Sequence, residues 1–313
     1  MAEISVGKNE VGPETVVSQY QSRTHWLWEY EKWFWDRDVV RETLLRWCGA
    51  APGSSILDVG CGIGGFLRLV SPYVQPGGRL VGVDKNVDAV ADGNAYNKTH
   101  GYAQIELEAL NGEDIATRFG DGKFDIVTEQ GALSSTPYPE SVNKIMAASF
   151  RVLKPGGAFF VIEEDLPSLL TGLWMFPGED EAQREWLMAI AKGALKVKGS
   201  NTRIGPEMPT LMYRYGFTGI RVLPYMAPSW FPPFEQWMID SLVTYAESIE
   251  IPSADIDGLR EFLHAAGLSD EQIAHDAEVM RKSWLARVEM MKRNEMPVEN
   301  KQIYYLAVGR KPL

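Results

Sequence analysis

The sequence predicts an α/β protein in which helices cover both faces of a doubly wound, seven-stranded and mostly parallel sheet. Three observations lead to this expectation. Short apolar segments alternate with segments of helical spacing from residue 51 to about residue 225. The first apolar segment runs directly into a glycine-rich turn, as a strand does before a helix. The chain closes on an apolar segment that pairs naturally with the strand predicted at 219–223.

The elements follow in a regular order along the chain. Strands are predicted at 55–59, 79–84, 105–109, 124–128, 158–162, 219–224 and 303–309. Helices are predicted at 66–70, 88–100, 143–153 and 181–196, and right-handed crossovers would place them on both faces of the sheet. A capping-box pattern at Ser269–Gln272 precedes an apolar stripe from Ile273 to Met291, which indicates a long helix.

These elements divide the 313 residues into four segments. Residues 1–50 are expected to form an aromatic-rich helical lid, and residues 51–225 the main α/β domain. Residues 226–300 are expected to be a helical insertion that covers a substrate pocket or forms dimer contacts. Residues 301–313 would supply the last strand of the sheet.

Composition excludes several classes of protein. The net charge of −11 argues against a nucleic-acid binder, because an acidic surface repels phosphates. Two cysteines and four histidines exclude a disulfide framework and give no metal-site spacing, so no metal is expected. No apolar run is long enough to span a bilayer, and the first residues lack the pattern of a secretory signal. The expected location is therefore the cytoplasm, and the expected partner is a small molecule.

The glycine-rich turn carries the strongest chemical signal. Gly60, Gly62 and Gly65 match the dinucleotide fingerprint, and Asp84 ends the next strand, where an acid can accept from a ribose diol. Asp58, however, lies two residues before the first glycine. A carboxylate there would repel a pyrophosphate and attract an ammonium or sulfonium ion. This position argues against a nicotinamide dinucleotide.

The motifs together resemble the class I S-adenosylmethionine-dependent methyltransferases of small-molecule type. The resemblance rests on DVGCGIGG, VGVD, FDIV and VLKPGG, which occur in this order, and it covers about residues 50–225 and the last ten residues. It implies the Rossmann-like methyltransferase fold, with S-adenosyl-L-methionine as the cofactor. It also implies that Gly60, Gly62 and Gly64 line the methionine part, that Asp58 holds its amino group and that Asp84 takes the ribose hydroxyls.

The sequence departs from the family after the third strand, where an aspartate usually accepts from the adenine amine. Asn111 stands at that position and its carbonyl can accept the same bond, while Asp114 is the competing choice. Lys85, Gly112 and Gln130 are assigned to the same cofactor site. Arg23 either pairs with the cofactor carboxylate or is a solvated surface residue.

Two aromatic regions are candidates for enclosing a substrate. Residues 26–35 hold five large aromatic side chains and Tyr30, and they form either a lid or a helix packed on the sheet. The insertion holds a second group, some of which must form its own core. The substrate-binding candidates are Trp26, Trp33, Trp230, Phe234 and Trp237.

Three residues are candidates for proton transfer. Glu129 follows the fourth strand, and Glu163 follows the fifth at the edge of the sheet where ligands bind. His25 lies beside the aromatic region. The alternatives are a solvated turn for Glu163 and a hydrogen-bonded histidine at a helix start for His25.

The sequence thus predicts methyl transfer to a small, largely apolar or aromatic acceptor, as in secondary metabolism. Two alternatives remain open at this point. The same fold can bind S-adenosylmethionine during a cyclisation or rearrangement, or it can serve as an inactive partner subunit. The sequence does not name the acceptor atom.

Overall fold

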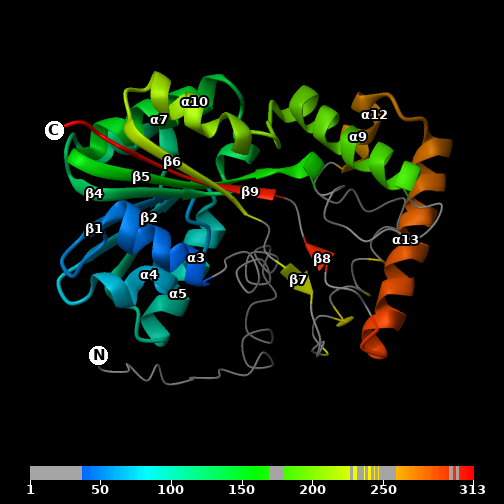
Figure 1. Cartoon of the computed structure of the whole chain (residues 1–313), viewed down its shortest axis with the longest axis horizontal. Coiled ribbons are helices and arrows are strands. Elements are labelled where there is room, and N and C mark those ends of the chain that lie inside the picture. The colour runs from blue at the N-terminus through cyan, green and yellow to red at the C-terminus, as the bar shows by residue number, and fades with distance from the viewer. Residues whose placement is uncertain are drawn as a thin grey trace.

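The protein is described by a computed structural model, and the structure describes residues 37–168, 180–225, 228–230, 259–295, 299–300 and 303–313, with a few single positions between 236 and 246. Its centre is a seven-stranded sheet of order β3-β2-β1-β4-β5-β9-β6 (Figure 1). The strands are β1 (Ser55–Val59), β2 (Arg79–Asp84), β3 (Ile105–Ala109), β4 (Phe124–Gln130), β5 (Leu153–Asp165), β6 (Thr218–Tyr225) and β9 (Ile303–Arg310).

The first five strands are parallel, and β9 is inserted between β5 and β6 antiparallel to both. This arrangement confirms the predicted sheet, including the return of the last strand beside β6. The strand order changes direction between β1 and β4. The loops that follow these two strands therefore lead to opposite sides and leave a crevice between them. Ligands bind at this position in open α/β sheets.

Helices cover both faces of the sheet (Figure 1). One face carries α3 (Arg37–Glu42), the π-helical turn η1 (Thr43–Cys48), α4 (Gly65–Val74) and α5 (Val87–Thr99). The other carries α6 (Ile115–Phe119), α7 (Glu140–Val152) and α10 (Met208–Arg214). Short 3₁₀ turns are η2 (Gly112–Asp114), η3 (Leu133–Ser135), η4 (Leu166–Ser168) and η5 (Gly205–Glu207).

The two cores follow from the alternation of side chains along the strands. Ile56 and Phe160 are buried in the cluster beneath α4 and α5, whereas Leu57 and Phe159 are buried in the cluster beneath α7 and α10. Neighbouring residues of one strand therefore belong to opposite cores. Strands that are apolar at consecutive positions are typical of a parallel sheet covered on both faces.

A third core holds a helical layer beside the sheet. It joins α9 (Asp180–Lys198), α12 (Leu259–Ala266) and α13 (Asp270–Lys292) around buried residues such as Trp186, Leu263 and Met280. A Cβ on Gly193 of α9 would lie 2.0 Å from the Phe262 carbonyl oxygen, so a glycine lets these two helices meet closely. The capping box of Ser269 and Gln272 at the start of α13 is present as predicted.

Two details differ from the expected elements. The segment expected to be helical from 226 to 300 contains a small antiparallel sheet of β7 (Pro228–Trp230) and β8 (Glu299–Asn300). Strand β5 begins at Leu153, five residues before the predicted start, because Leu153 pairs with Phe124 ahead of an irregularity in the ladder. The lid predicted within residues 1–50 lies largely outside the described residues.

Candidate functional site

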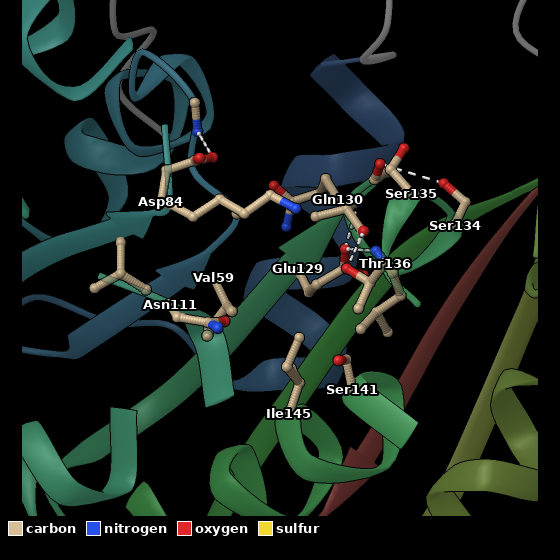
Figure 2. Close-up of a pocket in the computed structure, with 18 of the residues that line it drawn as sticks. Val59, Asp84, Asn111, Glu129, Gln130, Ser134, Ser135, Thr136, Ser141 and Ile145 are labelled. Atoms are coloured by element: carbon tan, nitrogen blue, oxygen red, sulfur yellow. Dashed lines mark hydrogen bonds between the residues drawn. The ribbon is translucent and has the colours of Figure 1, made fainter. Parts of the chain in front are cut away.

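A cavity of about 590 Å³ opens at the carboxyl ends of the parallel strands (Figure 2). Its walls come from the last residues of β1, β2 and β4 and from the segments that follow β1 to β4. Ala89 of α5, Ser141 and Ile145 of α7 and Glu164 of β5 complete them. The volume falls within the range of roughly 300–1,000 Å³ that is usual for small-molecule sites. The cavity therefore has the position and the size of a ligand site.

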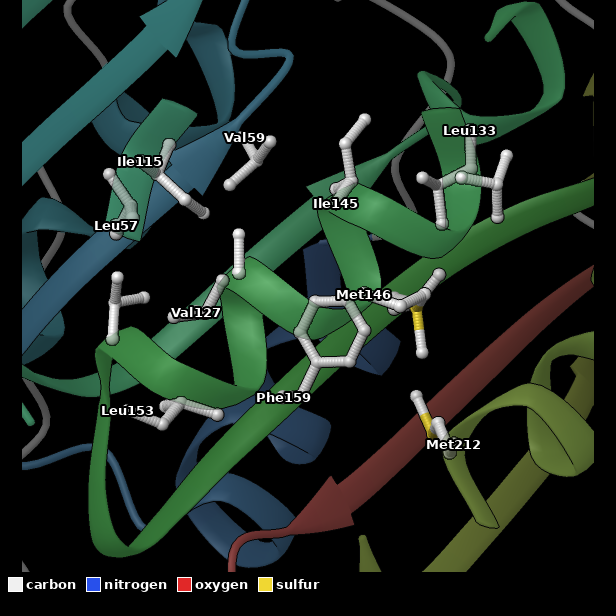
Figure 3. Close-up of a cluster of buried hydrophobic side chains, with 14 of the residues drawn as sticks. Leu57, Val59, Ile115, Val127, Leu133, Ile145, Met146, Leu153, Phe159 and Met212 are labelled. Atoms are coloured by element: carbon white, nitrogen blue, oxygen red, sulfur yellow. The ribbon is translucent and has the colours of Figure 1, made fainter. Parts of the chain in front are cut away.

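The floor of the cavity is continuous with the hydrophobic core. Val59, Leu133 and Ile145 line the cavity and also belong to the core cluster beneath α7 (Figure 3). Because these side chains are held by close packing, the polar groups around them have a rigid support.

The glycine turn after β1 is fixed by hydrogen bonds to β2. The backbone N–H groups of Gly60 and Cys61 donate to the Val83 carbonyl oxygen at 2.8 and 3.0 Å. Gly60 has a φ of 76°, and a Cβ on it would lie 2.3 Å from the Ala132 Cβ. Glycine is thus required both by the backbone conformation and by the approach of the segment that follows β4.

Asp84 links this turn to the second strand. Its carboxylate accepts from the Gly62 N–H at 2.9 Å through Oδ2 and from the Asn86 N–H at 2.8 Å through Oδ1. Asp84 and its neighbour Lys85 both line the cavity. An ionised carboxylate has about four acceptor sites, so Asp84 keeps further capacity for hydroxyl donors from a ligand.

The residues after β3 lie at the same cavity. Asn111 and Gly112 line it, whereas Asp114 is not among the lining residues. The Asn111 Oδ1 accepts from the Glu113 N–H at 3.2 Å, which fixes the side chain at the start of η2. Of the two residues that the sequence left as alternatives, the structure thus places Asn111 at the cavity.

Two of the expected cofactor residues lie behind the cavity wall. Asp58 is 2% exposed, and its Oδ1 accepts from the Thr128 hydroxyl at 2.8 Å. Gly64 is the N-cap of α4, where a Cβ would lie 3.0 Å from the Leu107 side chain. Neither residue lines the cavity, so each supports the loop from the core side.

Gln130, the last residue of β4, lines the cavity, and its side-chain amide finds no acceptor among the described residues. Its Nε2 atom is buried and has no hydrogen-bond partner within the described residues. A buried donor without a partner costs free energy, which a ligand acceptor in the cavity would recover.

Glu129 and Glu163 lie side by side beneath the segment that follows β4, and both are fully buried. Burial raises the pKa of Glu129 well above its ordinary value, and the neighbouring Glu163 raises it further. Burial also raises the pKa of Glu163, although the hydrogen bonds that it accepts oppose this effect. Glu129 reaches the cavity wall, and on β5 it is Glu164, not Glu163, that lines the cavity.

The remaining candidates lie outside the described residues. This holds for Arg23, His25, Trp26, Trp33, Phe234 and Trp237, while the backbone of Trp230 forms part of β7. The cavity also has a hydroxyl-bearing wall of Ser134, Ser135, Thr136 and Ser141, which was not among the residues expected from the sequence. The consecutive hydroxyl residues 134–136, which follow the fourth strand, were the sequence pattern that could have indicated this wall.

The described residues give no sign of two other kinds of site. No group of three or more His, Cys, Asp or Glu residues suited to a metal ion occurs in the described part of the chain. Among the helices that the structure describes, none combines the length and the apolar character needed to cross a bilayer.

The groups around the cavity suit S-adenosylmethionine better than a pyrophosphate. Asp84, Glu113 and Glu164 bring carboxylates to the wall, against Lys85 as the one cation among the described lining residues. Carboxylates attract an ammonium or sulfonium ion and repel phosphate. The unpartnered amide of Gln130 and the acceptor capacity of Asp84 match a polar ligand with both acceptors and hydroxyls.

Comparison with known proteins gives a consistent result. Residues 50–198 match the model of a methyltransferase domain. The demethylmenaquinone methyltransferase of Lactococcus lactis is 35% identical over 136 residues, which cover 44% of this chain and 52% of that protein. The sterol 24-C-methyltransferase of Yarrowia lipolytica is 34% identical over 115 residues, which cover 37% and 29%. The chain thus spans about half or less of the length of these relatives.

A solved structure shows the same fold. Phosphoethanolamine N-methyltransferase 2 of Haemonchus contortus, in complex with phosphomonomethylethanolamine and S-adenosylhomocysteine, aligns with a TM-score of 0.52 at 17% identity, covering 95% of this chain and 59% of that one. The motifs, the matched domain and the sheet order agree. Residues 50–198 thus form a methyltransferase domain, and the sheet order is that of the Rossmann-like fold of class I S-adenosylmethionine-dependent methyltransferases.

Proposed function

We propose that the protein transfers a methyl group from S-adenosylmethionine to a small-molecule acceptor bound in the cavity. The observation that carries this proposal is the convergence of four strand ends on one cavity: Gly60 and Gly62, Asp84, Asn111 and Gln130. The cofactor supplies an electrophilic methyl group. The protein needs to bind it, align the acceptor with it and exclude water.

The described residues divide this work between them. Asp84 would accept from the ribose hydroxyls, and Asn111 would accept from the adenine amine. Gln130 would donate to a ligand acceptor from its amide nitrogen, which has no partner in the described part of the chain. The acceptor molecule would then lie towards Ser134–Pro137 and Ser141, on the side of the cavity away from β2 and β3.

We further propose that the acceptor is largely apolar or aromatic, as in secondary metabolism. Two lines of support exist. The relatives named above are described as methylating demethylmenaquinone and a sterol. The sequence also concentrates aromatic side chains at 26–35 and 230–237, which suit the enclosure of a ring system.

The test is a turnover assay with S-adenosylmethionine and a panel of quinols, phenols, indoles, sterols and amines, in which S-adenosylhomocysteine is quantified. S-adenosylhomocysteine formation that depends on a quinol, phenol or sterol supports the proposal. Loss of this formation in Asp84→Asn would connect the activity to the cavity. Product with amines alone would contradict the apolar acceptor. Tight cofactor binding without product from any acceptor would contradict methyl transfer and favour a non-methylating role.

A further inference from the structure

In the segment that walls the cavity after β4, the N–H groups of residues 132–134 are held by two acids rather than by backbone carbonyl groups. Glu129 Oε1 accepts from the N–H groups of Ala132 at 2.6 Å and Leu133 at 2.8 Å (Figure 2). Glu163 Oε1 accepts from Leu133 at 2.7 Å and from the Ser134 N–H at 3.2 Å. Three consecutive N–H groups thus depend on two side chains.

The register of the sheet explains why these two acids meet. Glu129 of β4 pairs with Val161 of β5, and Glu163 is two residues further along β5. Side chains two residues apart on a strand lie on the same face of the sheet. The two carboxyl groups therefore project from one face, directly beneath η3.

One oxygen of this pair has no partner as long as both acids are ionised. Glu129 Oε2 is buried and receives no hydrogen bond within the described residues, and both side chains are 0% exposed. Two negative charges side by side without water are strongly unfavourable. A proton on Glu129 Oε2 resolves both problems, because the resulting hydroxyl can donate to the Glu163 carboxylate.

The pKa directions agree with this assignment. The pKa of Glu129 is raised, with burial and the charge of Glu163 as its main causes. Burial also raises the pKa of Glu163, against hydrogen bonds from Glu129, Leu133 and Ser134 that favour its charged form. The buried Oε2 of Glu129, which receives no hydrogen bond within the described residues, is the place where the shared proton fits.

We propose that Glu129 and Glu163 form a carboxyl–carboxylate pair that shares one proton and positions residues 132–134 as the wall of the cavity. The pair is a positioning device, and neither acid acts as the general base. The inference rests on the proposed function only in taking the cavity as the cofactor and acceptor site.

The first consequence of this arrangement is that glutamine can replace Glu129. The Glu129→Gln side chain keeps the oxygen that accepts from Ala132 and Leu133, and its amide supplies a permanent donor to Glu163. Glu129→Leu has a similar size but takes the acceptor away from the Ala132 N–H and leaves the Leu133 N–H with Glu163 alone. Glu140→Gln, at an exposed position of α7, is the matched control for loss of a surface carboxylate.

The binding experiment uses the full chain and S-adenosylhomocysteine as the probe in calorimetry. The dissociation constant of Glu129→Gln is expected within about threefold of the wild-type value, and that of Glu129→Leu about tenfold or more above it. Circular dichroism checks that each variant is folded. A loss of tenfold or more in a folded Glu129→Gln would overturn the proposal, because the ionised acid would then be needed for binding.

A spectroscopic experiment tests the shared proton without any ligand. The infrared difference spectrum between wild type and Glu129→Gln at neutral pH should contain the carbonyl stretch of a protonated carboxylic acid. The difference spectrum between wild type and Glu140→Gln should lack this band. Absence of that band from the first difference overturns the proposal even if both proteins bind the probe. If no protein binds the probe while the band is present, the proposed function fails and the pair stands.

Discussion

The contact between Gly60 and Ala132 gives a quantitative test of how the cavity is built. In Gly60→Ala the new Cβ would lie 2.3 Å from the Ala132 Cβ. Non-bonded carbons rest about 3.5 Å apart, so Ala132 must move by roughly 1.2 Å (3.5 minus 2.3). That displacement strains the 2.6 Å hydrogen bond from Ala132 to Glu129 and moves the cavity wall.

Two costs are therefore expected in Gly60→Ala. An alanine at a φ of 76° carries roughly 1–2 kcal/mol of backbone strain in the folded state. The displaced wall adds a second cost that depends on Ala132, and coupled contacts of this kind are worth about 0.5–3 kcal/mol. The second substitution Ala132→Gly removes the clashing atom and should recover this second cost alone.

The assay is a double-mutant cycle of wild type, Gly60→Ala, Ala132→Gly and the double variant. Binding of S-adenosylhomocysteine is measured by calorimetry and the melting temperature by circular dichroism. Gly60→Ala should weaken binding about tenfold, and the double variant should return to within about threefold of Ala132→Gly. Gly53→Ala is the matched control, because Gly53 has a φ of 88° with no atom within 4 Å of its Cβ position. It should lower the melting temperature without changing binding.

Additive effects of Gly60→Ala and Ala132→Gly on binding would contradict this expectation. If Ala132→Gly fails to restore binding in the Gly60→Ala background, the loss comes from backbone strain alone and the wall is not held against the glycine turn. If Gly53→Ala weakens binding as much as Gly60→Ala, the effect is a general loss of stability.

Three further predictions concern the site. In Asp84→Asn an amide NH2 group would face one of the two N–H groups that now donate to the carboxylate. Calorimetry should therefore show S-adenosylhomocysteine binding weakened about tenfold or more, and unchanged affinity would contradict the role assigned to Asp84. Asn111→Ala should weaken the same binding about threefold to tenfold, whereas Asp114→Ala should not, and equal losses would argue against Asn111. The third concerns pH: the raised pKa of Glu129 means that the folded state retains a proton that the unfolded state releases above the ordinary value of 4.5. The stability of wild type relative to Glu129→Gln should therefore fall as the pH rises from about 5 to about 8, and parallel melting curves would contradict a retained proton.

Much of the sheet could be predicted because its strands carry strong local signals. Consecutive apolar residues, glycine turns and helical spacing locate β1 to β5 and their helices. The carboxyl ends of the strands then identify Asp84, Asn111 and Gln130 as neighbours of one cavity. The last strand was predictable because it ends the chain on an apolar run.

The acids at the ends of β4 and β5 show what the sequence alone does not contain. The alternation of side chains along a strand puts Glu163 and Glu164 on opposite faces of the sheet. It does not say which of them faces the cavity, or which backbone groups each one contacts. That outcome depends on how the segment after β4 turns back over the sheet. The small sheet of β7 and β8 was missed for a different reason, since strands of three and two residues are too short for a pattern to be read.

The most direct test of the central claim is a calorimetric titration of the full chain with S-adenosylmethionine and, separately, with a nicotinamide dinucleotide. We expect one S-adenosylmethionine per chain, displacement by S-adenosylhomocysteine, weaker binding in Asp84→Asn and no binding of the dinucleotide. Binding of the dinucleotide in its place, or S-adenosylmethionine binding that is indifferent to Asp84→Asn, would contradict it.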